Sequence, residues 1–125
     1  MTRHVLETTQ IHPAIQDLVS NNHREIVEEV LRAMAEHDTV VVGMAQNPAV
    51  SGVRKTLSQA GIAHHYLEYG SYFSQWRRRN ALKMWTGWPT FPMVFHQGVL
   101  IGGHQDTKAL IAKGGMTASA RRLGD

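Results

Sequence analysis

Apolar positions recur along the chain at two spacings, one typical of helices and one typical of buried strands. Apolar residues at helical spacing follow Asn22, a predicted N-cap that has Glu25 at the capping-box distance, and they predict a helix ending near residues 37–38. An uninterrupted, β-branched apolar run over residues 39–44 predicts a buried strand. A helix followed directly by a buried strand is typical of α/β proteins.

The other elements follow from the same patterns and from Gly or Pro at their ends. They are helices over 11–20, 48–60, 72–85 and 106–113, and strands over 62–69, 93–96 and 99–101. Pro48 fits a first helical turn, Gly61 fits the position after a helix end, Asp106 is the predicted cap of the last helix, and Gln97-Gly98 predicts a hairpin turn. One strand–helix–strand crossover and one hairpin predict a four-stranded mixed sheet flanked by helices. This is the thioredoxin fold with an extra N-terminal helical segment.

Composition limits the chemistry that this chain can perform. Its 125 residues fit one domain, and 42% of them are hydrophobic. No apolar run approaches the roughly 20 residues that span a bilayer, and the N-terminus lacks the layout of a signal peptide, so we expect a soluble, cytoplasmic protein without a membrane partner. The absence of cysteine excludes disulfides, thiolate metal sites and thiol catalysis by this chain alone.

The charge is unevenly distributed. Residues 1–38 hold three Arg against seven Asp or Glu, a net charge of −4, whereas residues 39–125 hold ten Lys or Arg against three Asp or Glu, a net charge of +7. The larger part therefore suits an anionic ligand, although ordinary solubility charge would look the same. Arg and Trp interleave over 75–88, but helical spacing turns the Trp residues inward, so nucleic acid is not the expected partner.

One motif carries a family resemblance. The stretch Trp88-Pro89-Thr90-Phe91-Pro92 is followed, eleven residues beyond Pro92, by the second glycine of Gly102-Gly103, and Arg79 and Lys83 precede it at fixed spacing. In this combination the chain resembles the glutaredoxins, and most of all their monothiol branch. The resemblance divides the chain into an N-terminal helical extension (1–38), a glutaredoxin-like domain (39–114) and a C-terminal tail (115–125).

The chain departs from the family at the turn that carries the family's reactive cysteine. Counting back from Gly61, that segment falls on residues 47–50, with Asn47 at the first cysteine position and Val50 at the second. Counting forward from the strand shifts the register by one, to residues 48–51. Neither register supplies a sulfur, so we expect no catalytic residue and no thiol–disulfide oxidoreductase activity.

The resemblance implies a glutathione pocket. The family has a cis bond before the proline at Pro92, which presents the backbone of the preceding residue to an extended peptide. The helix start after the Gly-Gly pair holds the γ-glutamyl end, and the two cations hold the glycyl carboxylate. The residues expected to bind the ligand are Arg79, Lys83, Thr90, Phe91, Pro92, Gly103, His104 and Gln105. Gln105 stands where the family often has an Asp, and it supplies no charge.

These observations favour a redox-inactive glutaredoxin-like protein that binds glutathione or an extended thiol peptide, with an adaptor or regulatory role near thiol or iron–sulfur metabolism. No metal site or iron–sulfur cluster is expected, because the protein ligand is missing and no His pair has ligand spacing. One alternative is a protein-interaction module with a vestigial pocket, whose acidic helix (22–37) and basic helix (76–83) dock a partner or a second copy. Another is a glutathione-dependent transferase that uses Asn47 or Ser51 to position the thiolate.

Overall fold

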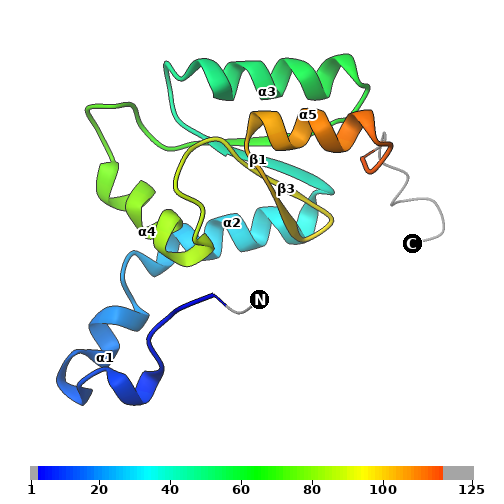
Figure 1. The fold of residues 1–125 in the computed structure, drawn as a ribbon. Helices are drawn as coiled ribbons and strands as arrows, with labels where there is room; N and C mark the ends of the chain where they lie inside the picture. The colour runs from blue at the N-terminus through cyan, green and yellow to red at the C-terminus, as the bar shows by residue number, and fades with distance from the viewer. Residues whose placement is uncertain (1–2, 117–125) are drawn as a thin grey trace.

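A four-stranded mixed sheet forms the centre of the computed structural model, which describes residues 3–116 (Figure 1). The strand order is β2-β1-β3-β4. Strand β1 (Thr39–Gly43) pairs parallel with β2 (His65–Glu68) and antiparallel with β3 (Met93–His96), and β3 pairs antiparallel with β4 (Val99–Gly102). The predicted crossover and hairpin, and with them the thioredoxin-type sheet, are confirmed.

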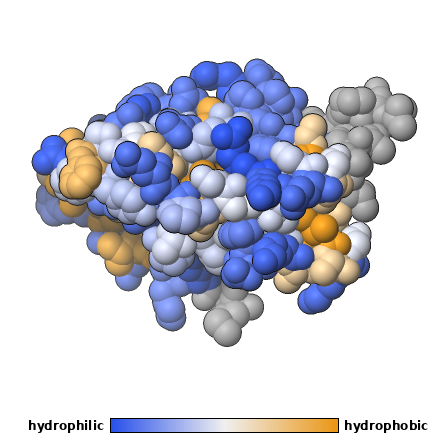
Figure 2. Space-filling view, turned by 90° about the horizontal axis from the view of Figure 1, so that it is seen from above, coloured by the Kyte–Doolittle hydropathy of each residue, from blue (hydrophilic) through white to orange (hydrophobic). Residues whose placement is uncertain are grey.

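Helices cover both faces of the sheet. In chain order the helical elements are η1 (Thr8–Gln10), α1 (Pro13–Ser20), α2 (Arg24–Glu36), α3 (Pro48–Gln59), α4 (Trp76–Thr86) and α5 (His104–Ala112). Figure 1 shows α3 and α5 side by side on one face and α2 with α4 on the other, whereas α1 extends away from the sheet. The face formed by α3 is mostly hydrophilic in Figure 2, and hydrophobic residues gather toward the edges of that view.

Strand β1 joins two separate hydrophobic layers. All five of its residues are buried. Because side chains alternate along a strand, Val40 and Val42 pack into the layer under α2 and α4, and Val41 packs into the layer under α3 and α5. A strand that is buried on both faces reads as a continuous apolar run, which explains why residues 39–44 were recognisable from the sequence.

Three helix starts differ from their predicted positions. Helix α2 begins at Arg24, because His23 takes the left-handed conformation (φ 47°) and becomes the cap residue in place of Asn22. Helix α4 begins at Trp76 rather than near residue 72, after a turn over 71–74. Helix α5 begins at His104, because the cap is Gly103 and the Asp106 carboxylate reaches back to the Gly103 N–H (3.0 Å).

The chain beyond the C-terminal end of the glutaredoxin-like region packs against the core. Beyond α5, Gly115 donates its N–H to the Leu110 carbonyl (2.9 Å), and Met116 is buried in the layer under α3 and α5. The core therefore reaches two residues past 114, and residues 117–125 of the predicted tail lie outside the described residues.

Among residues 3–116, no helix is long and apolar enough to cross a membrane.

Helices α3 and α5 meet closely at Gly52, which gives a first prediction. A Cβ atom on Gly52 would lie 2.6 Å from Cε1 of His104, whose Nε2 is 3.1 Å from the Thr56 hydroxyl. Gly52→Ala would displace this ring, so the gain of up to about 1 kcal/mol that Ala brings to a helix should be lost. In a His104→Ala background that gain should appear, giving a coupling of about 1 kcal/mol in a double-mutant cycle of unfolding free energies. If the changes in unfolding free energy of the two single variants sum to that of the double variant within about 0.5 kcal/mol, Gly52 and His104 are not in contact.

Candidate functional site

Asn47 is the N-cap of α3, and its side chain accepts hydrogen bonds from the first turn of the helix. Its Oδ1 accepts the N–H groups of Ala49 (2.9 Å) and Val50 (3.1 Å). The N–H of Ser51 goes to the Asn47 backbone carbonyl (3.1 Å), and Pro48, at the first helical position, has none. Of the four N–H positions without an internal carbonyl at this helix start, those of Ala49 and Val50 are bonded to Asn47 Oδ1 and Pro48 has no N–H, which leaves the N–H of Asn47 itself. The Asn47 side chain thus takes two donors of this turn that a thiolate or an external anion would otherwise use.

The position of the second family cysteine belongs to the core. Val50 is buried, and its two methyl groups lie 2.7 and 2.9 Å from the place that a Cβ on Gly43 would take. Val50 therefore packs directly against the end of β1. The capped residue Asn47 and the buried Val50 agree with the register in which the family segment falls on residues 47–50.

The Phe91–Pro92 corner lies just before β3. The peptide bond between these residues is cis, as the family resemblance implied, and both side chains are buried. Within residues 3–116 we find no backbone hydrogen bond from the N–H or carbonyl of Phe91 to another residue. Lys83 of α4 places its Nζ 5.8 Å from the centre of the Phe91 ring. The corner thus combines unused backbone groups with a cation.

The Gly-Gly bend lies against this corner, although ten residues separate them in the chain. A Cβ on Gly103 would meet the Pro92 carbonyl oxygen at 3.7 Å and Nε1 of Trp88 at 3.9 Å. These are ordinary van der Waals distances, so the bend lies directly against the corner. Nε1 of Trp88 is buried and has no hydrogen-bond partner among the described residues. The sequence analysis missed this donor, because the spacing of the Trp residues predicted only that they face inward as aromatic core residues.

The start of α5 can still receive an anion at two N–H groups. The N–H of Gly103 is used by Asp106 (3.0 Å), but those of His104 and Gln105 lie in the first turn, where a helix offers them no internal carbonyl. The His104 ring turns away toward α3 and Thr56. Burial, and to a smaller extent the nearby Lys108, lowers the pKa of His104. The contribution of His104 to this end of the cleft is therefore its backbone.

The two predicted cations have different surroundings. Arg79 is buried, and its Nη1 donates to the carbonyls of Tyr69 (3.0 Å) and Ser74 (2.5 Å). It thereby holds the turn between β2 and α4 in place. Lys83, one turn later, is only partly buried and lies over Phe91. Of this pair, Lys83 is the cation that reaches the Phe91–Pro92 corner.

The other predicted ligand residues flank the cleft. Thr90 precedes the corner and is exposed, and Gln105 is exposed on the first turn of α5. No group of three or more His, Cys, Asp or Glu side chains within residues 3–116 could hold a metal ion. The arrangement offers backbone donors, one cation and one carboxylate around an open bend, and these groups suit an extended, zwitterionic peptide.

Comparison with known proteins shows the family to which the chain belongs. The chain is 50% identical over 93 residues to a glutaredoxin-like protein from Dictyostelium discoideum. The aligned region covers 74% of this chain and 76% of that protein. The chain belongs to the glutaredoxin family. It is also 30% identical over 98 residues to the mitochondrial glutaredoxin-related protein 5 from Danio rerio, covering 75% of this chain and 63% of the relative. No family model matches the chain.

Solved glutaredoxin structures share the fold of this family member. Wheat glutaredoxin is 30% identical and superposes with a TM-score of 0.63, covering 73% of this chain and 84% of the wheat chain. A mutated buckwheat glutaredoxin is 23% identical with a TM-score of 0.67, covering 77% and 87%. The matched shares of this chain exceed the 87 residues from 39 to 125, so the similarity also includes part of the N-terminal helical segment.

The surroundings of Arg79 give a second prediction. If this side chain orders the turn before α4, Arg79→Met should leave the Tyr69 and Ser74 carbonyls without their donor and should cost about 2–4 kcal/mol of unfolding free energy in urea titrations. The exposed Arg77 on the same helix is the matched control, and Arg77→Met should change stability by less than about 0.5 kcal/mol. An Arg79→Met protein as stable as the wild type would contradict this structural role of Arg79.

Proposed function

We propose that this member of the glutaredoxin family binds glutathione, or an extended thiol peptide, between the Phe91–Pro92 corner and the Gly102-Gly103 bend, without forming a covalent bond to it. The observation that carries the proposal is the pairing of unused backbone groups at the Phe91–Pro92 corner with a helix start that the Asn47 side chain caps. A carboxamide is neither ionisable nor redox-active near neutral pH. The ligand is therefore held, and its thiol is not exchanged by this chain.

Each part of glutathione has a matching group in the cleft. The Cys backbone of the ligand pairs with the N–H and carbonyl of Phe91, as an added strand would. The γ-glutamyl carboxylate accepts from the N–H groups of His104 and Gln105, and the ammonium group lies near the Asp106 carboxylate. The glycyl carboxylate faces Lys83. A buckwheat glutaredoxin–glutathione complex, 22% identical with a TM-score of 0.65, shares this fold, and its ligand supports glutathione as the molecule to test.

A protein that binds a thiol ligand without reacting suits an adaptor or regulatory role near thiol or iron–sulfur metabolism. This role rests on the names of its relatives and on the missing sulfur, and it requires no catalytic residue. The transferase alternative would need a base beside Asn47 or Ser51. The oxygen of Asn47 is already committed to α3, and Ser51 is exposed on that helix, so binding is the better supported function.

Calorimetry with reduced glutathione is the direct test. The wild type should bind, and Lys83→Gln should weaken binding by about 3–10-fold, because loss of one charge-assisted contact costs about 1 kcal/mol. Arg77→Gln removes an equal charge from an exposed position of the same helix and should leave binding unchanged. The absence of both heat and NMR shifts at millimolar glutathione would end the proposal, and equal binding by wild type and Lys83→Gln would remove Lys83 from the site.

A further inference from the structure

The connection between β2 and α4, together with the first residue of α4, exposes three aromatic side chains. Phe73 is 93% exposed, and Tyr72 and Trp76 are 56% and 55% exposed. Arg77 places its guanidinium 5.2 Å from the centre of the Trp76 ring, so a cation accompanies this apolar surface. Aromatic side chains are enriched among the residues that dominate binding energy at interfaces. We call residues 70–76 the aromatic turn.

Hydrogen bonds hold the aromatic turn in one conformation. Ser74 donates its N–H to the Ser71 carbonyl (3.2 Å), and the Ser74 hydroxyl accepts the N–H of Ser71 (3.0 Å). Arg79 of α4 donates to the Ser74 carbonyl. Gly70 has a φ of +68°, and a Cβ there would lie 2.6 Å from the Ser74 carbonyl oxygen. The turn is therefore ordered before any partner arrives, which reduces the entropic cost of binding.

The aromatic turn and the proposed glutathione cleft lie at the same edge of the sheet (Figure 1). Strand β1 pairs parallel with β2 and antiparallel with β3, so its carboxyl end lies between the end of β2 and the start of β3. The Ala45 N–H donates to the Gly70 carbonyl (2.7 Å), which joins the turn after β1 to the turn after β2. In strand order, this edge carries the aromatic turn, the turn at Asn47, the Phe91–Pro92 corner and the Gly102-Gly103 bend.

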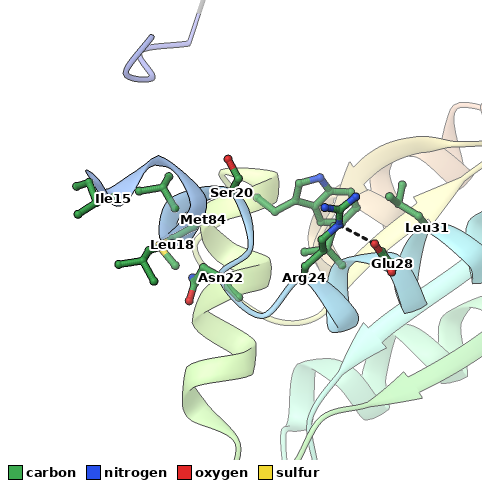
Figure 3. A pocket seen from close by; sticks show the side chains of 12 residues that line it. Ile15, Leu18, Ser20, Asn22, Arg24, Glu28, Leu31 and Met84 are labelled. Atoms are coloured by element: carbon green, nitrogen blue, oxygen red, sulfur yellow. Dashed lines mark hydrogen bonds and ion pairs between the residues drawn. The ribbon is translucent and has the colours of Figure 1, made fainter. Parts of the chain in front are cut away.

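Helix α4 connects the cleft with the aromatic turn along one face. Trp76 and Lys83 are seven residues apart, so they lie on the same face of the helix and about 10 Å from each other. The neighbouring Met84 lies instead beside Ile15 and Leu18 of α1, in a separate apolar groove (Figure 3). In the proposed complex the glycyl carboxylate of glutathione faces Lys83. A ligand reaches Trp76 only if it continues beyond that glycine by about three extended residues of about 3.3 Å each.

We propose that this edge of the sheet binds an extended protein segment that is longer than glutathione. The segment carries a thiol at the Phe91–Pro92 corner and an aliphatic or aromatic side chain about four residues further toward its C-terminus. That side chain packs on Phe73 and Trp76, and a carboxylate beside it pairs with Arg77. This inference rests on the proposed function and names the class of thiol peptide. Glutathione is then a shorter ligand that fills the cleft without reaching the aromatic turn.

Calorimetry with reduced peptides tests the longer ligand. Because the chain has no cysteine, it cannot capture these peptides as disulfides. One peptide extends glutathione beyond its glycine by Ser-Ser-Leu with a free carboxyl end, and the matched peptide extends it by Ser-Ser-Ser. The wild type should bind the Leu peptide about tenfold more tightly than the Ser peptide, because the Leu side chain leaves water on the aromatic turn.

Variants of the aromatic turn test where the Leu side chain lies. Phe73→Ser and Trp76→Ser should each reduce the preference for the Leu peptide to less than about threefold and leave glutathione affinity unchanged. Both side chains are exposed, so neither substitution removes core packing. Arg77→Gln should weaken binding of the Leu peptide by about threefold, because its carboxyl end loses a charged partner. Leu18→Ser, at a 71% exposed position on α1, is the control and should keep the full preference.

The outcomes separate this inference from the proposed function. Equal binding of the Leu and Ser peptides by the wild type, or a Leu preference that survives in both Phe73→Ser and Trp76→Ser, would overturn the longer ligand and leave glutathione binding intact. Equal binding of the Leu peptide by wild type and Arg77→Gln would remove Arg77 from the site. Binding of the Leu peptide without measurable binding of glutathione would support the longer ligand alone. The absence of binding by all three molecules would contradict both proposals.

Discussion

The hydrogen bonds that the Asn47 side chain accepts from the first turn of α3 set this chain apart from a thiol-dependent glutaredoxin. In a thiol-dependent site, the free N–H groups of a helix start lower the pKa of a cysteine and hold its thiolate. Here Oδ1 of Asn47 takes those of Ala49 and Val50. A side-chain cap of this kind contributes about 1 kcal/mol to stability. The same bonds occupy two donors that a thiolate would use, so the turn has a structural role and the proposed recognition groups lie elsewhere.

Those recognition groups come together because the hairpin of β3 and β4 folds the Gly102-Gly103 bend back onto the Phe91–Pro92 corner. The bend needs glycine at position 102, where φ is +122° and a Cβ would lie 2.7 Å from the Asp106 carboxylate oxygen. On the other side of the corner, Arg79 orders the turn before α4, and Lys83 lies one helical turn further. The positions of the proposed binding groups therefore depend on the sheet and α4, and they do not depend on the turn at Asn47.

Much of this fold could be read from local patterns. Strand β1 is buried on both faces, and α3 lies between a proline and a glycine, so periodicity and end signals were sufficient. The starts of α2 and α4 could not be read, because a left-handed His23 and a turn held by Arg79 are set by tertiary contacts. The same limit applies to the site. Spacing marked Arg79 and Lys83 as equivalent cations, and only packing shows that one is buried against carbonyls while the other lies over Phe91.

A crystal structure of the protein grown with saturating glutathione would show whether the ligand is held without a covalent bond. We expect the ligand to be extended along Phe91, with its γ-glutamyl carboxylate at the start of α5. Its sulfur should face α3 without a covalent bond, and the Asn47 oxygen should still accept from Ala49 and Val50. An empty cleft at saturating ligand, or an Asn47 side chain displaced from the helix start by the bound thiol, would contradict this expectation.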